Sequence, residues 1–214
     1  MPRWLFSLLL CLACAGAAQA ADPISREQAL HNLANAQAPV RRAAAVRLAE
    51  IGRMEDAAAL LPRLKDEDGD VREAAQSALW AVWSRSGDER IDALLARGTL
   101  AMNSGQFEEA LADFNRVVRQ KPGFAEGWNK RATLYYLVGE TRRSMADCAE
   151  VLKRNPNHFG ALSGYGQLYL QLEEPEKALQ FFERAYAINP GMPGVAANIT
   201  ALRRALEGRR RKMV

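Results

Sequence analysis

The sequence predicts an all-α fold, a right-handed solenoid in which helical hairpins stack in a row. Two internal repeats indicate it. Proline recurs at Pro122, Pro156 and Pro190, 34 residues apart each time, and the stretch VRRAAAVRLAEIG at 40–52 returns as VREAAQSALWAVW at 71–83. Hydrophobic residues make up 49% of the chain, and its Ala-, Leu-, Glu- and Arg-rich runs favour helix because these side chains lose little rotamer freedom there. A repeat cannot bury its apolar face alone, so neighbouring repeats have to stack.

Residues 1–20 have the order of a secretory signal peptide. A cation at Arg3 precedes an apolar run, and the stretch closes on small residues at Ala18 and Ala20. The run is shorter than the ~20 residues that span a bilayer. We therefore expect cleavage after Ala20 and a periplasmic or secreted protein. A lipid anchor attached to Cys14 is the alternative, and an uncleaved anchor is the third.

Residues 24–87 form the first expected repeat region. Ser25 followed by Gln28 predicts a capping box at its first helix, and an acidic turn at 66–70 separates the two copies of the Val-Arg-x-Ala-Ala stretch. The turn lacks the glutamate that closes a calcium loop, because Ser77 stands in that position, so it is interpreted as structural. The pattern resembles HEAT repeats of the phycobilisome-lyase type, without any match to a bilin site.

The joint between the two repeat regions lies at 84–90. Gly87 ends one helix in this stretch and Asp88 caps the next. Because the joint is short, we expect one continuous superhelix rather than two bodies on a flexible linker.

Residues 88–192 hold three copies of a 34-residue pattern. Counting back from each proline, a small residue stands 24 positions earlier, a second small residue 12 positions earlier and a bulky one 8 positions earlier. In the order of the copies, these are Gly98, Ala132 and Gly166, then Ala110, Ser144 and Ala178, then Phe114, Cys148 and Phe182. Small residues let paired helices approach closely. Gly105 and Gly139 mark turns between helices, and each proline ends a second helix.

This pattern resembles the tetratricopeptide repeat family over about residues 91–192. The middle copy carries residues of the family at the family's spacing: Trp128, Ala132, Tyr135, Gly139 and Pro156. The departures are Glu173 in place of the usual turn glycine, and Ser144 and Cys148 in place of the usual alanine and aromatic residue. The resemblance implies three stacked helical hairpins, and it places Arg131 half-buried against a neighbouring carboxylate.

Residues 193–207 predict a closing amphipathic helix. Its apolar side chains recur at helical spacing and are expected to cover the last repeat: Val195, Ile199, Leu202 and Leu206. Residues 208–214 are expected to form a basic, disordered tail. Weak contact of this tail with an anionic membrane surface is one hypothesis, and a solvated terminus is the other.

Chemistry-bearing residues form no catalytic pattern in the sequence. The two histidines, His31 and His158, lie far apart and lack partners at metal spacing. Phosphate-binding and nucleophile motifs are missing, and Cys148, the one cysteine left after cleavage, is expected to be buried. We therefore expect no enzyme, no cofactor and no metal. Nucleic acid is not expected as a partner, because export removes the chain from it.

A protein or peptide partner remains as the expected ligand. In the resembled family, one stripe of each first helix lines a concave groove. The corresponding residues here are Leu95, Thr99, Met102 and Asn103, then Asn129, Thr133 and Tyr136, then Ser163, Gln167 and Leu170. This stripe is nearly uncharged and lacks the Lys/Arg/Asn set with which some relatives clamp a C-terminal carboxylate. It suits an extended or helical peptide with neutral hydrogen-bonding groups.

The sequence thus predicts an exported scaffold or adaptor that binds a peptide or protein in its groove. The alternatives are an envelope-anchored lipoprotein that organises a multiprotein complex, and a non-catalytic accessory subunit of an envelope enzyme. The sequence assigns neither a particular partner nor an oligomeric state.

Overall fold

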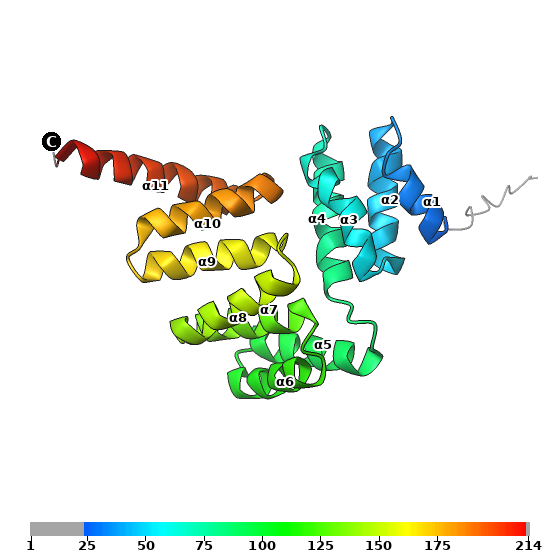
Figure 1. Cartoon of the computed structure of the whole chain (residues 1–214). Coiled ribbons are helices and arrows are strands. Elements are labelled where there is room, and N and C mark those ends of the chain that lie inside the picture. Colours follow the sequence, from blue (N-terminus) through cyan, green and yellow to red (C-terminus); the bar gives the residue numbers. More distant parts are fainter. Residues whose placement is uncertain (1–23, 213–214) are drawn as a thin grey trace, which may run out of the picture.

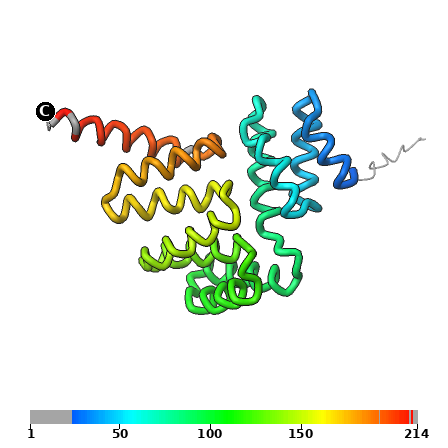
Figure 2. Tube along the Cα trace, in the orientation of Figure 1, coloured from blue at the N-terminus to red at the C-terminus, as the bar shows by residue number. Residues whose placement is uncertain are grey.

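The computed structural model describes residues 24–212, and every regular element in that range is helical (Figures 1 and 2). The all-α helical repeat fold is thereby confirmed. The expected signal peptide at 1–20, which includes Cys14, and residues 213–214 lie outside the described residues. Within 24–212, no helix combines the length and the apolar character needed to cross a bilayer.

The helices follow one another in short connections. The first region holds α1 (Arg26–Asn32), α2 (Ala38–Ile51), α3 (Ala57–Leu60) between two 3-10 turns (Met54–Asp56 and Leu61–Lys65), and α4 (Gly69–Trp83). The second holds α5 (Glu89–Asn103), α6 (Phe107–Gln120), α7 (Ala125–Leu137), α8 (Thr141–Arg154), α9 (Phe159–Gln171), α10 (Pro175–Ile188) and α11 (Pro193–Lys212).

The N-terminal unit, α1–α4, repeats at the level of single hydrogen bonds. Arg41 in α2 donates from Nη1 to the backbone carbonyls of Asn35 and Ala36, at 3.0 and 2.9 Å. Arg72 in α4 stands 31 residues later and donates to the carbonyls at the same two offsets, at 2.7 and 3.0 Å. The alignment of 40–52 with 71–83 is therefore confirmed, because each arginine closes the turn that precedes its own helix.

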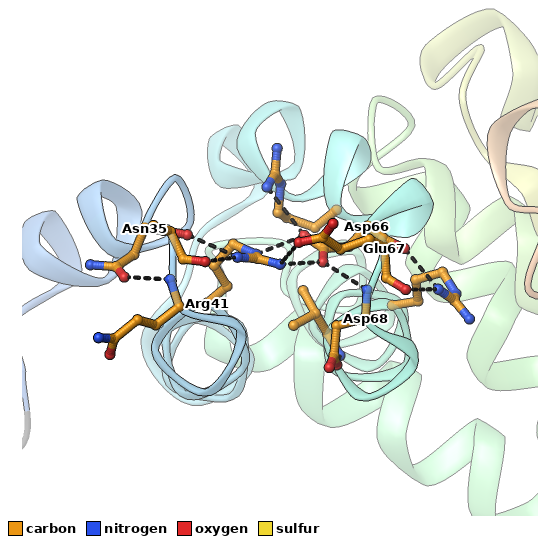
Figure 3. A network of polar contacts seen from close by, with 10 residues as sticks. Asn35, Arg41, Asp66, Glu67 and Asp68 are labelled. Atoms are coloured by element: carbon orange, nitrogen blue, oxygen red, sulfur yellow. Dashed lines mark hydrogen bonds and ion pairs between the residues drawn. The ribbon is translucent and has the colours of Figure 1, made fainter.

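The acidic turn joins the two hairpins of this unit (Figure 3). Arg41 donates to both carboxylate oxygens of Asp66, at 2.9 and 2.6 Å, and both side chains are buried. Asp68 caps α4 by accepting from the backbone N–H of Val71 at 3.0 Å. The hydrogen bonds from Arg41 hold the pKa of Asp66 below its usual value. These carboxylates thus serve the turn, as the sequence predicted.

Turns in the second region use the residues that the sequence singled out. Asp88 caps α5, accepting from the backbone N–H of Arg90 at 2.9 Å. Gly105 and Gly139 adopt φ of +75° and +78° in the turns within the first two hairpins. Glu173 takes the same left-handed place in the third, with φ +57°. The departure from glycine therefore leaves a side chain in a strained backbone conformation.

Small and bulky residues of the 34-residue pattern contact each other. A Cβ on Gly98 would lie 2.8 Å from Phe114, and one on Gly166 would lie 2.6 Å from Phe182. Glycine therefore makes room for an aromatic ring. In the middle hairpin Cys148 takes the place of the aromatic ring, and Ala132, which stands where the other two hairpins have glycine, packs in the same cluster. Where the bulky residue is smaller, the residue that faces it is larger, so the core between the two helices stays filled.

The expectation of one continuous superhelix is wrong. Helix α4 lies beside α9 and the α10–α11 turn, so the N-terminal unit runs along the side of the stack (Figures 1 and 2). Trp80 meets Phe159 with ring centroids 5.0 Å apart, and Asn189 donates to Gln76 at 2.5 Å. The reversal occurs at Gly87, where φ is +76°.

The joint itself is held from both sides. Arg85 donates to the carbonyl of Gly52 at 2.7 Å and to that of Glu50 at 2.9 Å, which ties the joint to the end of α2. Lys121 donates from Nζ to the carbonyl of Ser86 at 2.5 Å, which ties it to the end of α6. These bonds fix the direction in which the chain leaves α4.

The closing helix is longer than the sequence predicted. Helix α11 continues to Lys212, so the part of the expected disordered tail that the structure describes, 208–212, is helical. Its predicted apolar face is buried, as expected. The helix continues because residues 203–212 are mostly arginine, alanine, leucine and glutamate, all good helix formers.

Candidate functional site

A cavity of about 160 Å³ lies between α7 and α9. Asn129, Thr133 and Tyr136 reach it from α7, and Gln167 reaches it from α9. Gly160 also lines it, so part of the wall is bare backbone. We call this space the inner cavity. The structure therefore brings four of the predicted groove residues together from two successive repeats.

Polar groups of the inner cavity are oriented by their own helix. Thr133 donates its hydroxyl hydrogen to the carbonyl of Asn129 at 2.9 Å, which turns the hydroxyl back onto α7. The Asn129 amide nitrogen donates to both carboxylate oxygens of Glu126 at 3.2 Å. An amide has two donors and an acceptor oxygen, so Asn129 can be held in place and still bond a ligand.

A buried Glu126–His158 pair lies beneath this amide. Both side chains are fully buried, and His158 Nε2 lies 3.1 Å from Glu126 Oε2. His158 Nδ1 accepts from the backbone N–H of Ala161 at 3.1 Å, so the hydrogen sits on Nε2 and is donated to Glu126. Burial raises the pKa of Glu126, but the bond from His158 and the charge of Lys130 outweigh it and leave the pKa below its usual value.

The sequence missed the role of His158. It was considered as a possible metal ligand, yet its side chain is buried and caps α9. His31, by contrast, is on the surface. The signal for His158 was its position directly before an apolar helix start, where a capping side chain is common.

The groove stripe on α5 is not part of this site. Leu95 and Met102 are buried in the core with Phe114, because α6 and α7 pack over them, so their assignment to a ligand surface is wrong. Thr99 is half-buried and Asn103 is exposed, and neither lines the inner cavity. Only the α7 and α9 stripes meet.

A second cavity of about 340 Å³ adjoins the first and shares Gln167 with it. Ser163 lines this outer cavity, as the stripe predicts, whereas Leu170 is half-buried against the core of the last hairpin. Gln76 and Trp80 of α4 also line it. The sequence did not point to these two residues, because it predicted that α4 would stack elsewhere.

Both cavities are lined by uncharged residues. Among the described residues that line these cavities, there is no lysine, arginine, aspartate or glutamate. In the same part of the chain, no three His, Cys, Asp or Glu side chains gather as metal ligands would. Cys148 lies at the edge of the inner cavity, but burial raises the pKa of its thiol to about 12. The site can therefore form hydrogen bonds and apolar contacts.

The Lys130–Arg131 pair next to the site is structural. Arg131 donates to both oxygens of Asp147, at 2.7 and 2.8 Å, as the resemblance implied. Its guanidinium also lies 5.0 Å from the ring centre of Trp128. Lys130 Nζ lies 3.5 Å from the buried Glu126. Both cations thus have partners inside the fold.

Comparisons with known proteins agree with this architecture. A family model for the tetratricopeptide repeat matches residues 95–148 and 138–193. A TPR repeat-containing protein of Rhizobium etli is 32% identical over 152 residues, which cover 71% of this chain and 74% of that protein. Mouse tetratricopeptide repeat protein 21B is 29% identical over 125 residues, or 58% of this chain and 9% of that protein.

Solved structures show the same fold. The Sgt2 TPR domain from Aspergillus fumigatus superimposes with a TM-score of 0.54 at 18% identity, covering 58% of this chain and 83% of that one. The first TPR domain of Spaghetti (RPAP3), bound to an HSP90 peptide, gives 0.53 at 19% identity, covering 56% and 94%. With its repeated hairpins, its family match and its relative in Rhizobium, this chain belongs to the tetratricopeptide repeat family.

Proposed function

We propose that this protein is an interaction scaffold that binds an extended segment of a partner protein in the groove between α7 and α9. The observation that carries the proposal is the convergence of Asn129, Thr133, Tyr136 and Gln167 on one cavity. Tetratricopeptide repeat proteins are in general non-catalytic scaffolds, and the Spaghetti domain is seen with a peptide bound. No chemical step is assigned to the chain.

The chemistry of the groove favours an uncharged segment. Amide and hydroxyl groups can bond a peptide backbone, whereas a buried charge would lose its hydration without gaining a partner. The peptide in the Spaghetti structure, SRMEEVD, carries acidic residues near its end. We expect this groove to bind that peptide far more weakly than an uncharged one, because no cation lines it.

Crosslinking in cells tests the proposal. Partners crosslinked to the wild-type chain are identified by mass spectrometry and compared with those of an Asn129→Ala, Tyr136→Ala double variant. Asn103→Ala, Tyr186→Ala is the matched control, because it removes the same two residue types from exposed positions outside both cavities. Loss of a partner in the first variant alone supports the groove, and equal recovery from both contradicts it.

We further propose that the chain works outside the cytoplasm. Support comes from residues 1–20, which have the order of a signal peptide. Mass spectrometry of the mature N-terminus decides the form: Ala21 as first residue means a released protein, and a diacylated Cys14 means the envelope-anchored lipoprotein. A chain that keeps Met1 in the cytoplasm would contradict both.

Two finer assignments complete the proposal. The N-terminal unit is a pair of HEAT-like repeats, supported by the recurring contacts of Arg41 and Arg72 with their turns. The cationic end of α11 makes weak contact with anionic membrane surfaces, supported by its run of arginines at 209–211. Unchanged binding to anionic liposomes at low salt after deletion of 209–214 would exclude the second.

A further inference from the structure

We propose that α4 is a wall of the peptide groove, and that Gln76 and Trp80 form with α9 and α11 a second subsite for an uncharged, apolar side chain of the same bound segment. This inference rests on the proposed function, and it assigns a ligand-binding role to a unit outside the tetratricopeptide repeats. It makes the N-terminal unit a determinant of specificity.

The outer cavity supplies the space. It holds about 340 Å³ and is lined by Gln76 and Trp80 from α4, by Ser163 and Gln167 from α9, by Met192 in the turn before α11 and by Asn198 in α11. Gln167 also lines the inner cavity. A segment that leaves the inner cavity past Gln167 therefore enters the outer one.

Trp80 packs against the backbone of α9 at a glycine that lines the inner cavity. Gly160 lines the inner cavity, and a Cβ at this position would lie 2.5 Å from Cη2 of Trp80. The missing side chain is what lets the indole approach the backbone of α9. Trp80, which lines the outer cavity, is therefore packed against a residue that lines the inner one.

The wall is rigid, because α4 is fixed by contacts that the ligand does not have to provide. Trp83 stacks on His158 with ring centroids 4.7 Å apart and planes 22° apart. Asn189 donates to Gln76 at 2.5 Å, and Phe159 belongs to the same buried core as α2 and α4. A preformed wall spares the ligand the entropy of ordering it.

The lining decides the class of ligand. Trp80, Met192 and Val195 offer apolar surface, while Gln76, Gln167 and Asn198 offer amides. An apolar side chain of the bound segment can pack on the half-buried indole, while the amides nearby can form hydrogen bonds with the backbone of the same segment. A charged side chain would find no counter-ion in this lining.

The experiment uses the full chain and a phage-displayed library of random heptapeptides. We expect selected sequences to be uncharged with one large apolar residue, and the synthetic consensus peptide then serves as probe. Two single-cysteine substitutions report whether the outer cavity is occupied: Ser163→Cys, which lines it, and Ser77→Cys on α4, exposed and lining neither cavity. Alkylation at each position is followed by mass mapping, which separates it from the native cysteines.

The expected result is that the peptide slows alkylation of Ser163→Cys severalfold and leaves that of Ser77→Cys unchanged. Asn198→Ala, which removes one amide of the subsite without touching the contacts that hold α4, should weaken binding about fivefold, as expected for one hydrogen bond. Equal alkylation rates with and without a peptide whose binding depends on Asn129 and Tyr136 would overturn the inference alone. Failure to select any peptide, or indifference of the selected peptide to both residues, would instead overturn the proposed function.

Discussion

Removal of Arg41 should destabilise the N-terminal unit more than any neighbouring arginine. Its guanidinium bonds both oxygens of Asp66 and two backbone carbonyls, and the exposed fractions of the two side chains are only 6% and 2%. Removing one partner of a buried ion pair costs about 3–5 kcal/mol, because the other charge stays buried. Arg63 also reaches Asp66, at 3.2 Å, so Arg41→Ala should fall at the lower end, about 3 kcal/mol.

The matched control is the next residue. Arg42 forms an ion pair with Asp70 at 3.2 Å, but these side chains are 58% and 69% exposed. Exposed pairs contribute about 0–1 kcal/mol, so Arg42→Ala should be close to neutral. The two variants therefore differ in burial of the pair and hardly in sequence.

Urea denaturation followed by tryptophan fluorescence measures the difference, since Trp80 and Trp83 both lie on α4. With m-values of about 1–3 kcal/mol/M, a loss of ~3 kcal/mol lowers the midpoint by roughly 1–3 M. Equal midpoints for the two variants would show that burial of the Arg41–Asp66 pair adds nothing to the stability of the fold. The gap should also depend on pH. The bonds from Arg41 lower the pKa of Asp66, so their stabilisation is full above the usual value of 3.8 and is lost as pH falls through the lowered one.

Three further predictions concern single residues of the repeat stack. Glu173→Gly should stabilise the fold by about 0.5–1 kcal/mol, because glycine adopts a positive φ without strain, although its freer unfolded chain offsets part of the gain. A lower melting temperature of this variant would contradict the prediction. Cys148 should resist alkylation in the native protein at pH 8, because burial raises the pKa of its thiol to about 12; labelling at the rate of a free thiol would disprove it. The fold lowers the pKa of Glu126, so the stabilisation from its carboxylate should be complete above pH 4.5 and should fall on further acidification. The free energy of unfolding of Glu126→Gln should therefore change less between pH 6 and pH 3 than that of the wild-type chain.

Local features of the fold could be predicted from the sequence because short-range chemistry fixes them. The Ser25–Gln28 capping box, the Asp88 cap and the glycine turns each depend on a few adjacent residues. The 34-residue recurrence predicted the hairpins, since it marks where helices approach closely and where they end. Glu173 was identified as a departure, and the structure shows its cost as a positive φ.

The course of the chain between the two units could not be predicted in the same way. It depends on Gly87 and on contacts between surfaces far apart in sequence, such as Trp80 with Phe159. Repeat periodicity predicts how one repeat packs on the next. It does not predict that a whole unit will change direction and pack against the side of the stack. For the same reason the sequence missed α4 as part of the site.

Part of the candidate site was predictable. The positions of Asn129, Thr133, Tyr136 and Gln167 follow from helical spacing and the resemblance, and they do share a cavity. Leu95 was misassigned because the spacing of a stripe gives its direction on a helix, while burial depends on what packs over it. In the first repeat, α6 and α7 cover that stripe.

The affinity of the selected uncharged peptide is the most direct test of whether the groove between α7 and α9 binds a partner segment. Fluorescence anisotropy with a labelled peptide gives Kd for the wild-type chain, for Asn129→Ala, Tyr136→Ala and for the matched Asn103→Ala, Tyr186→Ala. Loss of two contacts of about 1 kcal/mol each should raise Kd about tenfold or more in the first variant, and Kd should stay unchanged in the second. The same Kd for all three chains would contradict this expectation.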